Sequence, residues 1–455
     1  MRIIIAGGGK MGLMLAEKLI LEKHNVTIID RDERVLEHCM DTLDALTVKG
    51  NGVSLETLKE ADVKHADIVI ATTLSDETNM LCCLTAKLQG AKYTIARIRD
   101  PEYLSSLSFI MKELFINYVV NPERATAREI SRMLRLPFAA SIETFARGRV
   151  EMVELHTNGH EPFLNIPLKD LYSKNSHLPR VLFCAVERDG HAVIPKGDFV
   201  IHPGDSVFVA SDTSTISAFF KAIGRNTRGV RDAMIVGGSR IAYYLATLLK
   251  ESGVKATIIE QKEEKARWLS EELRDVTIIH GDGTDQQLLL SEGLQEASSF
   301  ITLTDRDEEN LMAGLYATKQ MSGKVIVKSN RTSYSDLLRS MGLESIISPT
   351  QIACDIVLRT VRARANASGS SVERVYSLAG GSAEALEFIP RAGAPYIGVK
   401  LKDLKVHKNV LVAVIVRNGH VRVPFGEDAI EAEDHVIIVT KETGIVDLGD
   451  VLGIK

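Results

Sequence analysis

The chain has 455 residues, of which 45% are hydrophobic and 5% aromatic, and its 55 basic and 60 acidic side chains give a net charge of −5. This length is typical of about three domains, and the slightly acidic balance gives no indication of binding to nucleic acid or to an anionic membrane surface. The longest apolar run that we find, 410–416, is far shorter than the ~18 residues that a membrane-spanning helix needs.

The N-terminus and the cysteines predict a soluble, cytoplasmic protein. Met1 and Arg2 lead directly into an apolar run, so we expect no signal peptide. The cysteines are odd in number, two are adjacent, and C-x-x-C spacing is missing, which argues against a disulfide framework and a zinc site. We predict that the five cysteines are small buried side chains: Cys39, Cys82, Cys83, Cys184 and Cys354.

The stretch 2–30 carries the most informative motif of the chain. A β-branched run, 3–6, predicts a buried parallel strand, and helical spacing of apolar residues follows the glycines. Between them, Gly7, Gly9 and Gly12 match the G-x-G-x-x-G pattern of dinucleotide-binding folds. We expect Gly7 to make the turn, Gly9 to admit a pyrophosphate to the backbone, and Gly12 to let the helix lie close to the sheet.

Asp30 supports the same assignment. It follows the second predicted strand, 26–29, where an acidic side chain can bind both ribose hydroxyls of NAD and repel the 2′-phosphate of NADP. The phosphates would lie on the free N–H groups at the helix start. The adenosine part of ATP would satisfy the same residues, and a purely structural glycine turn is the alternative. The motif therefore predicts a nucleotide site that prefers NAD or NADH.

Strands and helices alternate through the first 136 residues, which predicts an α/β fold with a doubly wound, Rossmann-like parallel sheet. Ligands of such sheets bind beyond the carboxyl ends of the strands. The predicted strands are 3–6, 26–29, 45–49, 68–71, 93–96 and 116–120. The groups that follow five of these strand ends, and that should share one crevice, are Gly7 to Gly12, Asp30, Gly50 to Gly52, Thr73 and Arg97.

A different pattern begins near Phe138. Short β-like runs with turn residues indicate a small separate module, in which Asp189-Gly190 is the expected hairpin turn. The clearest runs are 150–155, 182–186, 191–195 and 207–210. Asn226 to Gly229 is the predicted linker to the second half of the chain.

After this linker the chain repeats itself, at an offset of 230 to 231 residues through most of the parallel-sheet domain and of 227 at its end. Ala233–Val236 is the new first strand, and the strand 256–259 ends in Glu260. The repeated segments, given as first and second copy, are 76–79 and 307–310, Arg97 and Lys328, 121–122 and 348–349, 168–171 and 401–404, and 188–191 and 417–420. We infer a tandem duplication of a two-domain unit.

This arrangement resembles the RCK (or KTN) regulatory unit of potassium channels and transporters, and its tandem form is similar to the regulatory subunit of the bacterial Trk potassium-uptake system. The similarity spans essentially the entire chain. Its most specific parts are the domain order, the Asp-Glu-Thr-Asn segment 76–79 and the Ala-Arg-Ile-Arg-Asp-Pro segment 96–101. The resemblance implies Rossmann-like nucleotide-binding domains at 1–136 and 229–366, each followed by a small α+β module, at 137–226 and 371–455.

The resemblance also implies the function. The chain would sense NAD(H) or ATP as a regulatory subunit that binds and gates a potassium-conducting membrane subunit of Trk type. It would form a dimer or tetramer ring with itself, and lie at the cytoplasmic face of the plasma membrane through that partner.

The resemblance implies two nucleotide sites. Position by position, the first would comprise Gly7, Gly8, Gly9, Lys10, Met11, Gly12, Asp30, Thr73, Leu74 and Arg97, and the second Gly237, Gly238, Ser239, Arg240, Ile241, Glu260, Thr304 and Lys328. The first half keeps all three turn glycines but has Asn51 and Val53 where the second has a Gly-Asp-Gly-Thr turn, 281–284. The second half has Ser239 and Ala242 at the second and third glycine positions. A side chain at 239 could crowd the pyrophosphate or hydrogen-bond it, so the occupancy of the second site stays open.

Four of these side chains have a simpler alternative role. Lys10 and Arg240 either pair with a phosphate or are solvated on the first helical turn. Thr73 and Thr304 either bind the nucleotide or cap a helix.

The strand ends and the helices beyond them carry further expectations. Arg97 and Lys328 should contact the nucleotide or an interface, whereas Asp76 and Asp307 should simply start helices. The helices after the Asn-Pro and Ser-Pro breaks, 123–134 and 351–364, would pack on their own sheet or, as the resemblance implies, cross to a partner domain.

An NAD-dependent oxidoreductase is the alternative function. Such an enzyme needs a substrate domain that brings an acid, base or nucleophile to the nicotinamide. We find no paired carboxylates or Cys/His set in the β modules, and His191 and His420 lie beside hairpin turns. We therefore expect a non-enzymatic regulator without catalytic or metal-binding residues, and leave open whether the β modules bind an effector of their own.

Overall fold

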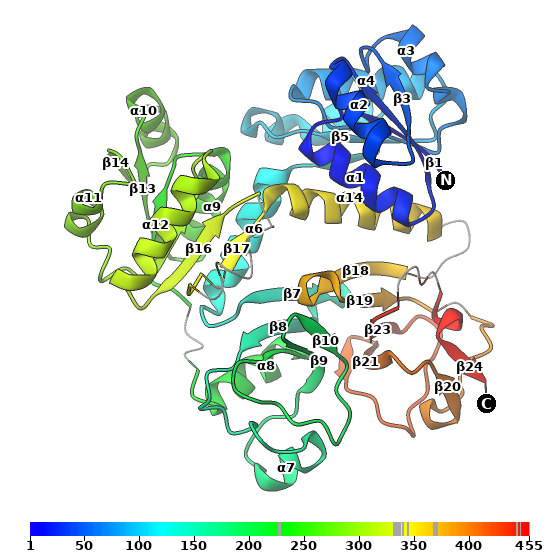
Figure 1. Cartoon of the computed structure of the whole chain (residues 1–455), viewed down its shortest axis with the longest axis vertical. Coiled ribbons are helices and arrows are strands. Elements are labelled where there is room, and N and C mark those ends of the chain that lie inside the picture. The colour runs from blue at the N-terminus through cyan, green and yellow to red at the C-terminus, as the bar shows by residue number, and fades with distance from the viewer. Residues whose placement is uncertain are drawn as a thin grey trace. The chain divides into compact units, whose positions relative to one another are not determined.

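The computed structural model describes residues 1–225, 229–330, 338, 341–343, 345–366, 372–390, 392–442, 445 and 447–454. By their contacts, the residues form two compact units, one of Met1–Ser131 with Val230–Val361 and one of Arg132–Gly229 with Arg362–Lys455 (Figure 1). Residues 226–228 of the predicted linker lie outside the described residues.

The first unit begins with a wholly parallel sheet in the order β3-β2-β1-β4-β5-β6. Its strands are β1 (Arg2–Ala6), β2 (Asn25–Asp30), β3 (Leu46–Lys49), β4 (Ile68–Ala71), β5 (Tyr93–Arg97) and β6 (Tyr118–Val120). The helices between and after them are α1 (Lys10–Leu21), α2 (Glu33–Thr42), α3 (Leu55–Glu60), η1 (Val63–His65), α4 (Asp76–Leu88), η2 (Pro101–Ser106), α5 (Leu107–Glu113) and α6 (Pro122–Arg135). This strand order is that of Rossmann domains, in which the chain reverses direction at the crevice between β1 and β4.

The central strand β1 explains why this sheet is buried on both faces. Its residues alternate between two cores: Ile3 and Ile5 pack with Leu15 of α1, while Ile4 packs on the other face with Leu58. Alternation of this kind follows from the two-residue period of a strand. Each such buried side chain contributes about 1.5–3 kcal/mol, which fixes the strand ends in place.

The second half of the first unit repeats this architecture. Its parallel sheet, in the order β14-β13-β12-β15-β16-β17, consists of β12 (Asp232–Val236), β13 (Lys255–Glu260), β14 (Thr277–His280), β15 (Ser299–Thr302), β16 (Lys324–Lys328) and β17 (Ser345–Ile347). The described helices are α9 (Arg240–Glu251), α10 (Glu263–Glu272), α11 (Gln286–Ser291), α12 (Asp307–Gln320) and α14 (Pro349–Asn366). The predicted α/β class with two Rossmann-like sheets is confirmed, as are the helix starts at Asp76 and Asp307.

Helix α14 packs against the first nucleotide domain. Cys354, Val357 and Val361 join the core of the first nucleotide domain, and α14 runs alongside α1 (Figure 1). An ion pair between Lys18 of α1 and Asp355 of α14, 2.9 Å long, lies on the same contact. The crossing that the family resemblance implies therefore occurs within this one chain for α14.

Among its described residues, the second unit holds two five-stranded antiparallel sheets and one two-stranded antiparallel sheet. The first, in the order β10-β9-β11-β8-β7, comprises β7 (Ser141–Phe145), β8 (Val150–His156), β9 (Leu182–Arg188), β10 (His191–Val193) and β11 (Ser206–Asp212), with η3 (Ala146–Gly148), η4 (Leu168–Asp170), α7 (Leu171–Lys174) and α8 (Thr213–Ala222). The second, in the order β18-β19-β23-β21-β22, comprises β18 (Val372–Leu378), β19 (Ala383–Phe388), β21 (Val410–Arg417), β22 (His420–Arg422) and β23 (His435–Thr440). Its other elements are η5 (Ala379–Gly381), η6 (Leu401–Asp403), β20 (Leu404–Val406), η7 (Leu448–Asp450) and β24 (Leu452–Ile454).

The two modules share one core, in which Phe145 and Phe208 of the first pack with Leu378 and Ile437 of the second. Asp189 and Gly190 make the predicted hairpin turn with positive φ angles of 51° and 73°. The prediction missed β7 and α8, because their short or mixed patterns gave no clear period.

Two further sequence expectations concern the whole chain. The five cysteines are free and buried, as predicted. Within the described part of the chain, we find no helix with both the length and the apolar character needed to span a bilayer.

Candidate functional site

The glycine turn of the first domain brings α1 against β1. Gly7 has a φ of 107°, which favours glycine, and its N–H donates to the Ile29 carbonyl at 2.8 Å. A Cβ at Gly12 would lie only 1.9 Å from the Gly7 oxygen. The expected turn and the expected close approach of helix and sheet are both present.

The N-terminus of α1 is open at Gly9. This residue is the N-cap of α1, has no side chain to cap the helix, and would have no heavy atom within 4 Å of a Cβ. Lys10 beside it is exposed, whereas the Met11 side chain is buried in the core. The first backbone N–H groups of a helix lack partners within the helix and attract anions. Met11 can therefore serve a phosphate only through its backbone.

Asp30 holds the turn together. Its carboxylate accepts hydrogen bonds from the Gly8 N–H at 2.7 Å and from the Asp32 N–H at 2.9 Å. The sequence motif predicts a ribose ligand, and the structure adds a backbone role that the sequence did not reveal. Each carboxylate oxygen accepts more than one hydrogen bond, so the two roles are compatible.

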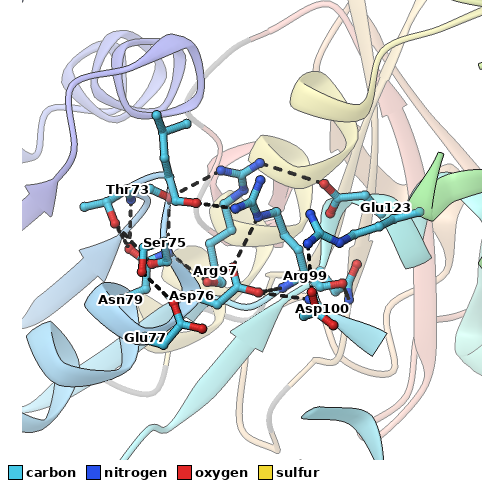
Figure 2. Close-up of polar contacts among 12 residues, drawn as sticks. Thr73, Ser75, Asp76, Glu77, Asn79, Arg97, Arg99, Asp100 and Glu123 are labelled. Carbon is cyan, nitrogen blue, oxygen red and sulfur yellow. Dashed lines mark hydrogen bonds and ion pairs between the residues drawn. The ribbon is translucent and has the colours of Figure 1, made fainter. Parts of the chain in front are cut away.

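The opposite wall of the crevice comes from the ends of β4 and β5. The Thr73 N–H and hydroxyl donate to Asn79 Oδ1 at 2.8 and 2.7 Å, and Arg97 Nη1 donates to the Thr73 carbonyl at 3.4 Å (Figure 2). Gly7 adjoins this wall, because a Cβ there would lie 3.0 Å from the Thr73 nitrogen. Leu74 is 85% exposed. The structure thus brings the first set of predicted residues together at the carboxyl ends of neighbouring strands.

Arg97 carries a charge that its surroundings compensate poorly. The guanidinium lies 3.9 Å from the Glu123 carboxylate, and both Arg97 Nε and Glu123 Oε2 are buried without a hydrogen-bond partner. Burial and the nearby charge of Arg99 lower the pKa of Arg97. Burial also raises the pKa of Glu123, against the opposing effect of Arg97. A phosphate or carboxylate ligand would give Arg97 the close partner that it lacks.

Asp76 anchors the loop after β5. Its carboxylate accepts hydrogen bonds from the Arg99 and Asp100 N–H groups at 2.8 and 2.9 Å, and from Arg99 Nε at 3.2 Å (Figure 2). The loop in turn contacts the second nucleotide domain. Tyr244 of α9 donates to the Arg99 carbonyl at 2.9 Å, and Arg240 pairs with Asp100 at 2.7 Å. The loop after Arg97 is therefore a direct contact between the two nucleotide domains.

The second glycine turn has the same framework but a closed helix start. Gly237 has a φ of 93°, and Glu260 accepts from the Gly238 N–H at 2.8 Å, as Asp30 does in the first half. Ser239 caps α9 with its side chain, which accepts from the Ala242 N–H at 3.4 Å. The hydroxyl thus takes one of the donors that a phosphate would use.

The remaining side chains of the second set are buried or already have partners within the protein. Arg240 is drawn to Asp100 rather than held at its own turn, and the Ile241 side chain is buried. Thr304 donates to Asn310 as Thr73 does to Asn79. Lys328 is 7% exposed, and burial lowers its pKa, with Asp305 3.8 Å away. The two glycine turns share the positive-φ glycine and the acidic residue that accepts from the next N–H, and they differ in whether a side chain caps the helix that follows.

Sequence reasoning missed three groups in the first crevice. Asn79 links the two strand ends, Asp76 holds the loop as well as starting α4, and Glu123 faces Arg97. The repetition of Asp and Asn at the same spacing in 76–79 and 307–310 was the available signal for the first two. Glu123 had no such signal, because Thr350 stands at the equivalent place.

Comparison with known proteins assigns the chain to a family. The model of the TrkA-N domain matches residues 3–122 and 233–349, and that of the TrkA-C domain matches 153–224 and 386–453. The chain belongs to the TrkA family. A relative named Trk system potassium uptake protein TrkA, from Vibrio alginolyticus, is 31% identical over 446 residues, covering 96% of this chain and 95% of that protein. A TrkA homolog from Archaeoglobus fulgidus is 31% identical over 97% of both chains.

Solved structures of the same fold include the RCK domain of GsuK. It matches 96% of this chain and 92% of its own length with a TM-score of 0.62 and 19% sequence identity. A structure described as the GsuK channel bound to NAD gives a TM-score of 0.62 at 18% identity, covering 96% of this chain and 76% of that one. At this identity the likeness shows the fold, and it confirms the predicted resemblance to RCK units in architecture.

Proposed function

We propose that this TrkA-family chain is a cytoplasmic regulatory subunit that senses NAD(H), with ATP or ADP as alternatives, and thereby gates a potassium-uptake transporter. The observation that carries the proposal is the uncapped start of α1 at Gly9, beside the strand ends that carry Asp30 and Arg97. Relatives of similar length are named as potassium uptake proteins of the Trk system, and a structure of the same fold is described as bound to NAD.

The first site would use its residues in distinct ways. The backbone around Gly9 and Lys10 would receive the pyrophosphate, Asp30 would accept from the ribose, and Arg97 would offer a buried cation. The full proposed set is the one expected from the sequence: Gly7, Gly8, Gly9, Lys10, Met11, Gly12, Asp30, Thr73, Leu74 and Arg97. The second set, from Gly237 to Lys328, is the weaker candidate because Ser239 caps its helix and Arg240 pairs with Asp100.

A signal could leave the first site through the loop after β5. Arg97 lies two residues before Arg99, whose carbonyl accepts a hydrogen bond from Tyr244 of the second nucleotide domain. A nucleotide that binds one arrangement of these domains more tightly than another shifts the population toward that arrangement. We propose that this shift is what reaches the membrane partner, a potassium-conducting subunit of Trk type.

The same proposal includes the assembly and the domain bounds. Two or four such chains would form a ring with the partner, and closed symmetry would suit a dimeric pore. The four domains would span 1–136, 137–226, 229–366 and 371–455. Nucleic acid is not part of the proposed function.

Co-purification with a potassium-transport membrane protein, followed by potassium flux in vesicles, tests this function. The flux should depend on the chain and should change when NADH, NAD, ATP or ADP is added singly. A chain that co-purifies with no such protein, or a flux that is identical with and without it, would refute the proposal.

A further inference from the structure

The side chain of Asn79 lies between the ends of β4 and β5 and is completely buried. Its Nδ2 donates to the Arg97 carbonyl at 2.9 Å and to the Thr73 carbonyl at 3.2 Å. Its Oδ1 accepts from the Thr73 N–H and from the Thr73 hydroxyl. An amide side chain offers two donors and two acceptor positions, so Asn79 is fully used.

This amide continues the sheet where the strands stop pairing. The parallel ladder of β4 and β5 ends at Ala71 opposite Ala96, and Thr73 and Arg97 lie just beyond it. Without Asn79, no backbone ladder would hold these two residues together at the mouth of the crevice. The part-buried carbonyls that it satisfies would also be costly to leave without donors.

The second domain contains the same arrangement independently. Asn310 is completely buried, accepts from the Thr304 N–H and hydroxyl at 2.9 and 2.8 Å, and donates to the Thr304 and Lys328 carbonyls at 3.1 Å each. The two segments belong to the duplication and share Asp, Glu and Asn at the same spacing, while Thr78 is replaced by Glu309. Four identical hydrogen bonds in both copies indicate a defined task at the strand ends rather than generic packing.

The hydrogen bonds of Asn79 to Thr73 and Arg97, which we call the Asn79 clamp, also determine whether the Thr73 hydroxyl can donate or accept. Its single proton is directed to Asn79 Oδ1 at 2.7 Å, with the Ser75 carbonyl 3.3 Å away as the other protein acceptor. Toward a ligand, the hydroxyl can then only accept a hydrogen bond. A phosphate oxygen has no proton to give, whereas ribose hydroxyls and the adenine amino group do.

We propose that Asn79 is a positioning residue for the nucleotide in the first crevice. It holds Thr73 and Arg97 in register and presents the Thr73 hydroxyl as an acceptor to the ribose or base rather than to the phosphates. This inference rests on the proposed nucleotide site and adds to it the orientation of one wall.

The test compares Asn79→Asp with Asn117→Asp in the full chain by calorimetric titration with NADH. Asn117 is exposed and accepts from the Thr94 N–H at 2.9 Å near the opposite end of β5, so it controls for the same substitution away from the site. Asn79→Asp keeps the shape but replaces two donors by an acceptor that faces two carbonyls. We expect NADH binding at pH 8 to weaken about tenfold or more, and the control to stay within about twofold of the wild type.

The pH dependence separates positioning from general damage. Protonation of the aspartate at position 79 would return one donor, so the affinity of Asn79→Asp relative to the wild type should rise as pH falls from 8 to 6. A folded Asn79→Asp variant with wild-type affinity at pH 8 would overturn the inference.

A measurement on the wild type covers the case in which Asn79→Asp does not fold. The Thr73 amide proton should exchange with solvent slowly in the absence of nucleotide, because it is donated to Asn79. If the Thr73 amide proton exchanged as fast as that of an unprotected loop residue, its hydrogen bond to Asn79 and the inference built on it would be refuted. Failure of the wild type to bind NADH would instead refute the nucleotide site, and slow exchange of Thr73 would then still show that the clamp exists.

Discussion

Exchanging the residue at the start of α1 should change folding and nucleotide binding in opposite directions. Gly9→Ser places on α1 the cap that Ser239 provides for α9. The backbone of Gly9, with φ of −68° and ψ of −173°, is open to any residue, and its Cβ would meet no atom within 4 Å. We therefore expect stability to rise by a few tenths of a kcal/mol, the usual difference between serine and glycine as a cap.

The same hydroxyl should weaken binding of NADH. It would take a helix N–H that otherwise donates to a phosphate, and one hydrogen bond to a charged group contributes about 1.5–3 kcal/mol. The dissociation constant should then rise about 10- to 150-fold. Titration calorimetry with NADH, together with thermal unfolding, measures both effects, and Ser239→Gly is the matched control that should leave the first site unchanged. Unchanged or tighter binding by a stable Gly9→Ser variant would refute the assignment of the phosphate to this turn.

Three further substitutions test the same crevice. Gly12→Ala should lower the stability of the first unit by about 1–3 kcal/mol or more, because the new Cβ would start 1.9 Å from the Gly7 oxygen; an unchanged unfolding midpoint would contradict the close packing. Asp30→Asn should raise the affinity for NADPH relative to NADH, since the carboxylate no longer repels a 2′-phosphate, and equal losses for both in competition titrations would count against the ribose assignment. Burial raises the pKa of Glu123, so its ionisation destabilises the native state as pH rises through that raised pKa. The unfolding midpoint of Glu123→Gln should therefore match that of the wild type at pH 4 and exceed it at pH 8. The exposed control Glu113→Gln should show no such difference. A Glu123→Gln midpoint below that of the wild type at pH 8 would show that the ionised Glu123 stabilises the native state, contrary to this prediction.

The sequence predicted those parts of the fold that have a strong period. Buried β-branched runs such as Ile3–Ala6 and the glycine turns gave the two parallel sheets, and the duplication extended the assignment to the second half. The strand β7 and the helix α8 were missed, because Ser141–Phe145 and Thr213–Ala222 carry mixed patterns.

The sequence did not predict which distant residues the candidate site residues contact. Asp30 was expected as a ribose ligand, and only the fold reveals that it also binds the N–H of Gly8. Arg240 was expected either to pair with a phosphate or to be solvated, and only the fold reveals that it pairs with Asp100, 140 residues away in the chain. Such contacts depend on how domains meet, which no local pattern encodes.

Titration of NADH into the purified full chain, with recovery of the nucleotide afterwards, tests the central claim most directly. We predict saturable binding that Gly9→Ser weakens, and NADH that is recovered intact after prolonged incubation. Absence of binding at millimolar NADH would contradict the nucleotide site, and consumption of NADH above its spontaneous rate would contradict the regulatory role.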